Sequence, residues 1–381
     1  MTNDETRHKT SLTKIGDAQD ILRHHLECLW EDPLVAAHLP PMMLWGPPGI
    51  GKSAIIAELA EELDIGFIDV RLAQREPVDI RGLPVPREDR QGVDWIVSSD
   101  WPREGQDNFK PRGIILFDEI TAADPSMQVA AYEFILDRRL GQLYSVPDGW
   151  YIVAAGNRTQ DGAVARTMSS ALANRFCHLE MRSDAGTWCD WAWANGIHPS
   201  VIAFIRFRPD LLFSMTGDRE RGWPSPRSWA RVSLEMQLAE RHGLSEGIVR
   251  HIIEGLVGTG AAIEFDGFTR WTDQLPNIEK MLVGEDPVFI PDRADQKFGL
   301  VSAMVHHILE EPDLLGIING IFDILLAFSN DWCQMAYHDL ELTLTGRHRL
   351  DDLALIKTHL RHEEILDKLL GQNVPEEVVA E

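Results

Sequence analysis

The chain has 381 residues, of which 44% are hydrophobic and 25% charged, an ordinary composition that excludes a wholly disordered or fibrous protein. Its 36 Lys and Arg and 60 Asp and Glu residues leave a net charge of −24. This charge repels phosphate backbones, so broad nucleic-acid binding is disfavoured, although a local basic pore would escape the argument. The four cysteines form no C-x-x-C pair, which favours reduced thiols in a cytoplasmic protein over a zinc site or a disulfide framework.

The N-terminal half alternates short apolar runs with helical patterns, after a polar tail over residues 1–14. Helical spacing of apolar residues predicts helices over residues 17–38, 53–63 and 125–137. Buried strands are expected over residues 42–45, 66–72, 113–117, 150–155 and 175–181. Strands that alternate with helices predict an α/β core with a parallel sheet over residues 15–183.

Residues 75–102 interrupt this alternation with prolines, glycines and charges around an apolar run at 93–97. The pattern predicts a loop with a small hairpin near residues 82–100 that projects from the core. Trp95 lies in this hairpin and could contact a substrate or partner, although packing against its own subunit is the simpler explanation.

After about residue 183 the strand signals fade and helical patterns take over. Helices are expected over residues 188–193, 201–207, 228–239, 247–257, 300–309, 314–328 and 351–370. We expect an all-α region divided into a helical lid over 184–270 and a C-terminal helical region over 271–370, followed by an acidic tail over 371–381. The apolar stretch at 314–328 is too short and too polar for a membrane span.

A glycine-rich motif follows the first predicted core strand and precedes a predicted helix. Its residues are Gly46, Pro47, Pro48, Gly49, Ile50, Gly51, Lys52 and Ser53, which match G-x-x-x-x-G-K-[ST] at every fixed position. Glycines let the backbone curl so that N–H groups point at phosphate oxygens, and the helix adds its N-terminal dipole. Lys52 would then neutralise the β- and γ-phosphates of ATP, and Ser53 would ligate Mg²⁺. A chance match in a glycine- and proline-rich turn is the alternative, and the flanking strand and helix argue against it.

Two carboxylates, Asp118 and Glu119, end the apolar run that starts at residue 113. Asp118 would hold Mg²⁺, mostly through water, and Glu119 would orient and polarise the water that attacks the γ-phosphate. A solvated turn is the usual explanation of an Asp-Glu pair at a strand end. The phosphate loop earlier in the chain favours the catalytic interpretation.

The phosphate loop followed by the Asp118-Glu119 pair resembles the AAA+ ATPases, and within them the MoxR-like branch. The resemblance covers about residues 15–270 and adds three polar positions. Asn157, after an apolar strand, looks like the "sensor 1" residue of that branch. Arg175, in A-L-A-N-R-F, is similar to its arginine finger. Arg227, in S-P-R-S, is similar to its "sensor 2" arginine in the helical lid, with Arg231 as the nearest substitute.

Each of these positions has a structural alternative. Asn157 could cap a turn, and Arg175 or Arg227 could be a partner in a structural ion pair. Arg158 and Arg166 lie in the same loop region as Arg175 and could supply the finger in its place.

The resemblance implies a Mg²⁺-dependent ATPase that hydrolyses ATP to ADP and phosphate and uses the cycle to remodel a protein partner, as a chaperone does. It implies a homo-oligomer, a hexameric ring in which Arg175 reaches a neighbouring site. It also implies a partner with a von Willebrand A domain. Residues 79–83 resemble the segment that precedes a hairpin inserted into the second helix of that branch.

Two other functions remain open from the sequence. The first is an AAA+ motor that acts on nucleic acid, in restriction or DNA processing, which the net charge of −24 disfavours. The second is a nucleotide-gated scaffold with little turnover, which the intact Lys52, Asp118 and Glu119 disfavour.

Overall fold

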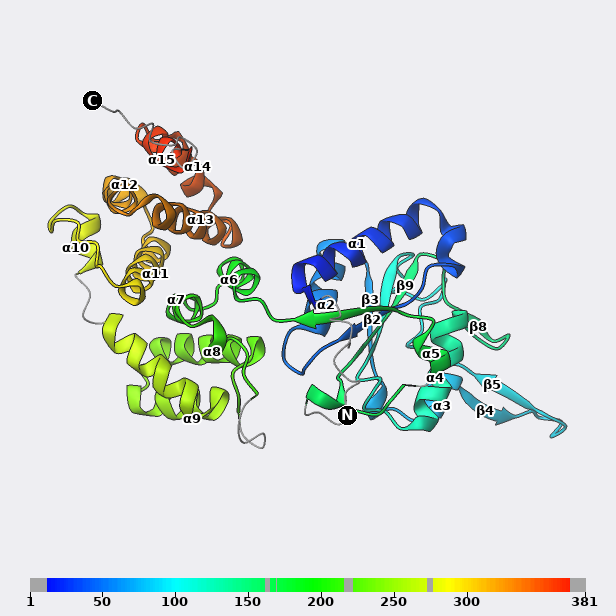
Figure 1. Cartoon of the computed structure of the whole chain (residues 1–381). Helices are drawn as coiled ribbons and strands as arrows, with labels where there is room; N and C mark the ends of the chain where they lie inside the picture. Colours follow the sequence, from blue (N-terminus) through cyan, green and yellow to red (C-terminus); the bar gives the residue numbers. More distant parts are fainter. Residues whose placement is uncertain (1–11, 162–164, 169, 216–221, 273–276, 371–381) are drawn as a thin grey trace, which may run out of the picture. The chain divides into compact units, whose positions relative to one another are not determined.

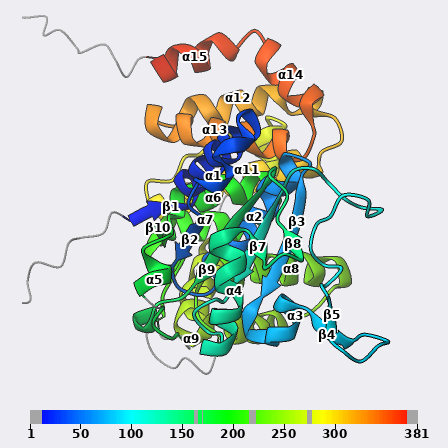
Figure 2. The ribbon, with the colours of Figure 1, turned by 90° about the vertical axis from the view of Figure 1, so that its right-hand side faces the viewer.

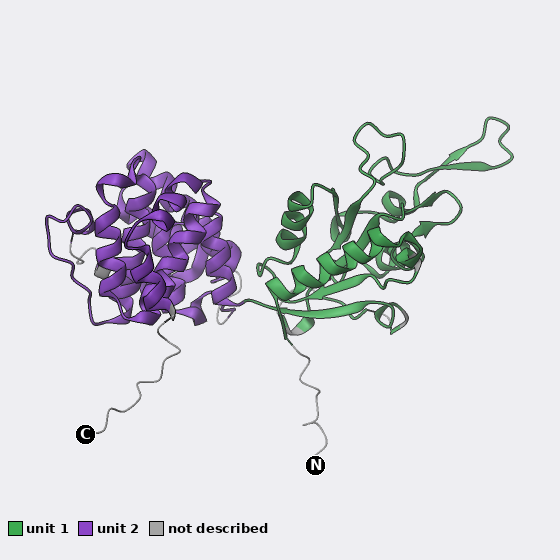
Figure 3. Ribbon diagram, turned by 90° about the horizontal axis from the view of Figure 1, so that it is seen from above, with its two compact units in different colours: residues 1–183 green, residues 184–381 purple. Residues whose placement is uncertain are grey.

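The chain folds into two compact units, which Figure 3 colours separately. The computed structural model describes residues 12–161, 165–168, 170–215, 222–272 and 277–370. Unit 1 spans Met1–Ser183 and unit 2 spans Asp184–Glu381. Each unit has a hydrophobic core of its own.

In the described part of unit 1, six parallel strands form one sheet in the order β1-β10-β2-β9-β6-β3. In that order they are β1 (Leu12–Lys14), β10 (Cys177–Arg182), β2 (Met42–Trp45), β9 (Trp150–Gly156), β6 (Gly113–Asp118) and β3 (Gly66–Arg71). The residues of β2 and β9 are all buried, and those of β6 are buried except at its last position. Continuous burial is typical of parallel strands covered on both faces, and the predicted α/β class is confirmed.

Helices cover this sheet. They are α1 (Ile15–Glu31), α2 (Lys52–Glu62), α3 (Pro77–Arg81), α4 (Pro125–Asp137) and α5 (Ser170–Ala173), with 3₁₀ turns at Pro33–Ala37, Leu72–Gln74 and Thr159–Asp161. On α4, Met127 and Phe134 pack with Ile115 and Phe117 of β6 in one core. Because strand residues alternate between faces, the buried Ile114 lies on the other face of the sheet, against which α2 packs.

Two segments of unit 1 differ from their predicted structure. Leu12–Lys14 belongs to strand β1 and not to a polar tail, because it pairs in parallel with β10 in the register Leu12↔Glu180. The region expected to be a loop contains α3, which starts at Pro77 and is stabilised by a hydrogen bond from the Glu76 N–H to Asp79.

A hairpin projects from unit 1, as Figures 1 and 2 show. Its antiparallel strands are β4 (Leu83–Pro86) and β5 (Val93–Ile96). It lies within the predicted range of 82–100. A second, smaller hairpin joins β7 (Arg139–Leu140) and β8 (Tyr144–Ser145).

The described part of unit 2 is helical. Its helices are α6 (Ala185–Ala194), α7 (Pro199–Phe207), α8 (Pro226–His242), α9 (Glu246–Thr272), α10 (Ile278–Leu282), α11 (Ala294–Glu310), α12 (Ile318–Ala327), α13 (Asn330–Gly346), α14 (Leu350–Thr358) and α15 (His362–Leu370), with 3₁₀ turns at Pro209–Leu211 and Leu314–Gly316. None of the helices described by the structure is long and apolar enough to cross a membrane.

One hydrophobic core runs through unit 2. It joins Phe204 and Trp229, from the predicted lid, to Met304 and Phe322, from the predicted C-terminal region. Residues 271–370 therefore form no compact unit separate from the lid, and the division at residue 270 stays a prediction about function.

Candidate nucleotide site

The register of the parallel strands brings the predicted site residues to one edge of the sheet. Trp45 pairs with Gly156, so that Gly46 and Asn157 both follow the carboxyl ends of neighbouring strands. Phe117 pairs with Ala154, which places Asp118 at the same edge. Open parallel sheets bind ligands at this carboxyl edge.

The glycine-rich loop takes backbone conformations that require glycine. Gly46, Gly49 and Gly51 have φ values of 152°, 87° and 104°. A Cβ on Gly46 would lie 2.6 Å from Cδ1 of Ile50. Helix α2 starts directly after Gly51, and the first N–H groups of a helix have no partner within it. The loop and the helix start together supply the N–H donors that a phosphate group requires.

Lys52 is 8% exposed, and its side chain is held at the carboxyl edge of the sheet. Its Nζ donates to the carbonyl oxygens of Gly46 at 2.6 Å and Pro47 at 3.0 Å, and to Oδ1 of Asn157 at 2.9 Å. An ammonium group has three N–H donors, so all three bonds form at once. The structure thus brings together the predicted phosphate-binding lysine and the predicted sensor.

Thr121 fixes the backbone of Asn157, and nothing in the sequence singled it out. The Thr121 hydroxyl oxygen accepts from the Asn157 N–H at 3.0 Å and donates to the Asn157 carbonyl oxygen at 3.0 Å. This contact joins residues 36 positions apart. A threonine shortly after the acidic pair was the available signal, but it carries little information without the fold.

The two predicted Mg²⁺ ligands contact each other. The Ser53 hydroxyl donates to Oδ2 of Asp118 at 2.5 Å, and Oδ1 of Asp118 accepts from the Glu119 N–H at 2.8 Å. A hydroxyl and a carboxylate are the oxygen donors that Mg²⁺ prefers, so this donor set fits the ion. Ser53 and Asp118 would hold it together with water and phosphate oxygens.

Glu119 has a left-handed backbone, with φ at 55°. Few residues other than glycine adopt this conformation, and such residues cluster at functional sites. Arg71, which pairs with Asp118 across β3 and β6, faces this acidic edge. Its pKa is raised mainly by a hydrogen bond to Asp69, with a further contribution from the charges of Asp118 and Glu119.

The three candidate finger arginines differ in how they are held. Arg158 stacks on the Trp45 ring at 4.4 Å and forms an ion pair with Glu180. Arg166 forms an ion pair with Asp124 at 2.7 Å. Arg175 is exposed just after α5, and its side chain bonds to no residue in the described part of the chain. Of the three candidates, Arg175 is therefore the one whose guanidinium could bind a phosphate without first breaking a contact with a described residue.

Arg227 is exposed in the first turn of α8 and belongs to unit 2. The helix starts with a capping box, in which Ser225 and Ser228 exchange backbone-to-side-chain hydrogen bonds. The role of Arg227 and of its substitute Arg231 toward the phosphate loop stays a prediction.

A comparison with protein families agrees with this geometry. Residues 41–176 match the family described as AAA domain (dynein-related subfamily). Residues 41–176 form an AAA domain. AAA domains use ATP with Mg²⁺, and the match supports ATP hydrolysis by this chain.

Curated relatives and solved structures resemble parts of the chain. It is 26% identical to Midasin of Giardia intestinalis over 165 residues, which are 41% of this chain and 3% of that protein. It is 28% identical to Replication factor C subunit 2 of Saccharomyces cerevisiae over 109 residues, which are 28% of this chain and 31% of that protein. The chain therefore spans less than a third of either relative. A RuvB structure from Thermotoga maritima aligns with 78% of this chain and 85% of its own, at 14% identity and a TM-score of 0.36.

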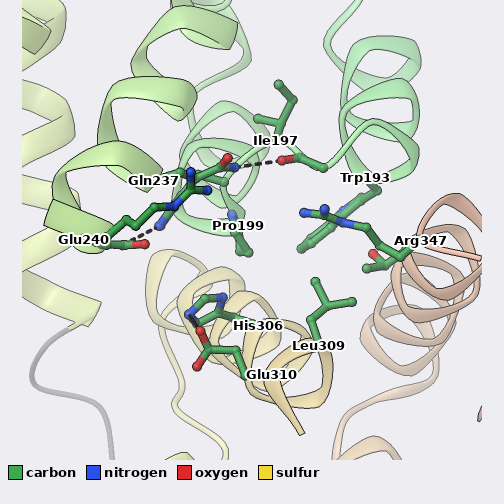
Figure 4. Close-up of a pocket in the computed structure, with 13 residues that line it drawn as sticks. Trp193, Ile197, Pro199, Gln237, Glu240, His306, Leu309, Glu310 and Arg347 are labelled. Atoms are coloured by element: carbon green, nitrogen blue, oxygen red, sulfur yellow. Dashed lines mark hydrogen bonds and ion pairs between the residues drawn. The ribbon is translucent and has the colours of Figure 1, made fainter. Parts of the chain in front are cut away.

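A separate pocket of about 470 Å³ lies in unit 2, outside the AAA domain (Figure 4). Its carboxylates face histidines. His198 Nε2 lies 2.9 Å from Glu240, and His306 Nε2 lies 3.7 Å from Glu310. Within the described ranges, no group of three or more His, Cys, Asp or Glu side chains is placed to hold a metal ion. The pocket has no glycine-rich loop, so the AAA domain holds the candidate nucleotide site.

Proposed function

We propose that this protein is a ring-forming AAA+ ATPase of the MoxR-like type. It hydrolyses ATP to ADP and phosphate with Mg²⁺ and uses the cycle to remodel or activate a protein partner in the cytoplasm. The observation that carries the proposal is the pair of contacts at the sheet edge, Lys52 with Asn157 and Ser53 with Asp118. They bring together a cation, a polar sensor and a magnesium-binding pair.

The chain's own residues divide the chemistry between them. The glycine-rich loop and Lys52 bind and orient the phosphates, and Mg²⁺ held by Ser53 and Asp118 supplies charge neutralisation. Glu119 orients the attacking water and accepts its proton, and Asn157 fixes the position of that water against the γ-phosphate. Most of the rate enhancement then comes from positioning and electrostatic stabilisation.

Arg175 supports assembly into a ring, which we propose to be a hexamer. A guanidinium is always charged and binds two phosphate oxygens at once. The exposed Arg175 side chain bonds to no described residue of its own chain, so it can serve the site of a neighbouring subunit. Arg227 of the helical lid is proposed to be the second sensor of the bound nucleotide.

The hairpin of β4 and β5 supports a protein client. Leu83 is 57% exposed, Trp95 44% and Ile96 59%. Apolar side chains on a projecting hairpin fit apolar protein surface. Residues 83–96 carry two arginines and three acidic residues, a net charge of −1, which does not favour a phosphate backbone. From the family resemblance, the client is a protein with a von Willebrand A domain.

The likeness to Replication factor C subunit 2 favours a second function, a motor that acts on nucleic acid. The net charge of −24 weighs against it. The two functions differ in what stimulates hydrolysis, either a protein client or DNA at low salt.

A client-trapping experiment tests the proposal. Glu119→Gln should stay in the ATP state and retain a specific protein, whereas Lys52→Ala, which cannot load ATP, should not. A client captured by both variants or by neither would contradict the proposal. Hydrolysis stimulated by DNA, with strong salt dependence, would favour the nucleic-acid motor.

A further inference from the structure

Trp45, the last residue of β2, connects the phosphate loop to the neighbouring strand β10. It directly precedes Gly46. Its indole Nε1 donates to Nδ1 of His178 at 2.8 Å, and the two rings are inclined by only 17°. The other ring nitrogen of His178, Nε2, lies 2.7 Å from the carbonyl oxygen of Ala173. Ala173 ends α5, two residues before Arg175.

These two contacts fix the protonation state of His178. An indole nitrogen only donates, so Nδ1 must accept and carries no hydrogen. A carbonyl oxygen only accepts, so Nε2 must carry the hydrogen. Both bonds form only with the neutral Nε2–H tautomer.

A second route from the nucleotide site ends on the same indole ring. Arg158 directly follows Asn157, whose Oδ1 accepts from Lys52 at 2.9 Å. The Arg158 guanidinium lies 4.4 Å from the centre of the Trp45 ring, and its Nε donates to Glu180 at 3.0 Å. Trp45 is therefore connected to both parts of the nucleotide site. The phosphate loop follows it directly in the chain, and Arg158, next to the sensor Asn157, stacks on its ring.

We propose that His178 is a positioning residue that couples the phosphate loop to Arg175. His178 bonds to both Trp45 and Ala173, and so fixes the position of the last residue of α5 relative to the phosphate loop. That position determines the direction in which the Arg175 side chain projects. The finger that a subunit offers to its neighbour then depends on the nucleotide in its own site. The charged side chains that face this group are Arg158 and Glu180. The inference rests on the proposed role of Arg175.

A double-mutant cycle tests the coupling. His178→Phe keeps a planar ring and loses both hydrogen bonds. It should lower kcat about fivefold at pH 8 and leave KM for ATP unchanged, because Lys52 and the loop are intact. In the Arg175→Ala background, His178→Phe should have no further effect. Equal losses in both backgrounds would overturn the proposal.

A second variant gives an independent readout. Trp45→Phe removes the indole donor and keeps a smaller aromatic ring for Arg158. It should lower kcat as His178→Phe does and leave KM for ATP unchanged, so the coupling can still be tested if His178→Phe fails to fold.

The outcomes separate this inference from the proposed function. If wild type releases no phosphate, or Arg175→Ala equals wild type, the proposed function has failed. If Arg175→Ala lowers kcat while both His178→Phe and Trp45→Phe behave as wild type, the coupling alone is wrong.

Discussion

The Lys52 ammonium nitrogen lies 2.9 Å from the Asn157 side-chain oxygen, although 105 residues separate them in the chain. Parallel pairing of β2 with β9 explains the contact, because the two strands end side by side. The same lysine also bonds to two carbonyl oxygens of its own loop. All three of its N–H donors are bonded to protein oxygens, so a phosphate that binds Lys52 would replace at least one of these bonds.

Lys52→Ala should weaken ATP binding by at least about tenfold, because the phosphates lose a buried charge-assisted partner. Titration with a fluorescent ATP analogue measures the affinity. Lys110→Ala is the matched control, since Lys110 forms an exposed ion pair with Asp64 and should leave binding unchanged. Wild-type affinity in Lys52→Ala would rule out the proposed role of the loop.

Arg175→Ala should lower turnover on the order of a hundredfold or more and ATP affinity only modestly, because a finger acts on the transition state. Arg166→Ala is the control, because Arg166 is already paired with Asp124. Steady-state phosphate release measures both variants. A larger loss in Arg166→Ala would transfer the finger role to Arg166.

Mixing subunits tests whether Arg175 acts across an interface. Arg175→Ala and Glu119→Gln subunits should each be inactive alone. In a mixed ring, a Glu119→Gln subunit can offer its Arg175 to an Arg175→Ala neighbour that keeps Glu119. Activity should therefore return on mixing. No recovery, in rings shown by mass spectrometry to be mixed, would place Arg175 within its own site.

Asp339 predicts a pH dependence of the stability of unit 2. Its carboxylate is buried on α13 and lies 2.6 Å from Arg206. Burial raises the pKa of Asp339 to about 7, against the attraction of Arg206. The folded state then binds more protons than the unfolded state between about pH 4 and 7. The free energy of unfolding should therefore fall as pH rises through this window, by at most about 1.4 kcal/mol per pH unit from this group.

Asp339→Asn should flatten that slope. Chemical denaturation between pH 5 and 7.5 measures it, and Asp351→Asn, an exposed carboxylate of α14, is the control. Parallel curves for wild type and Asp339→Asn would show that Asp339 does not titrate in this range.

The sequence predicted the strands and the motif residues because both are local signals. β2, β6 and β9 are largely apolar runs; the motif that contains Lys52 follows β2, and Asp118 is the last residue of β6. Helix α13 was missed because two polar residues, Asp339 and Thr343, lie buried on its inner side and interrupt the apolar period. Residues 314–328, expected as one helix, form a 3₁₀ turn followed by α12. Residues 351–370, also expected as one helix, form the two helices α14 and α15.

The contacts that connect the site residues were out of reach of the sequence. Thr121 with Asn157, and Trp45 with His178, join residues brought together by the order of strands in the sheet. Strand β1 consists of only three residues at the edge of the sheet. It is a strand because it pairs with β10, and its composition alone does not predict one.

Glu119→Gln tests the central claim, ATP hydrolysis at the edge of this sheet, most directly. Nucleotide binding and phosphate release are measured on the same preparations of wild type and variant. Wild type should release phosphate from Mg-ATP and stop when EDTA removes the metal ion. The variant should bind ATP within about twofold of wild type yet turn over at least about a hundredfold more slowly, since an amide cannot accept the proton of the attacking water. Turnover at the wild-type rate in Glu119→Gln, or no phosphate release by the wild type, would contradict the account.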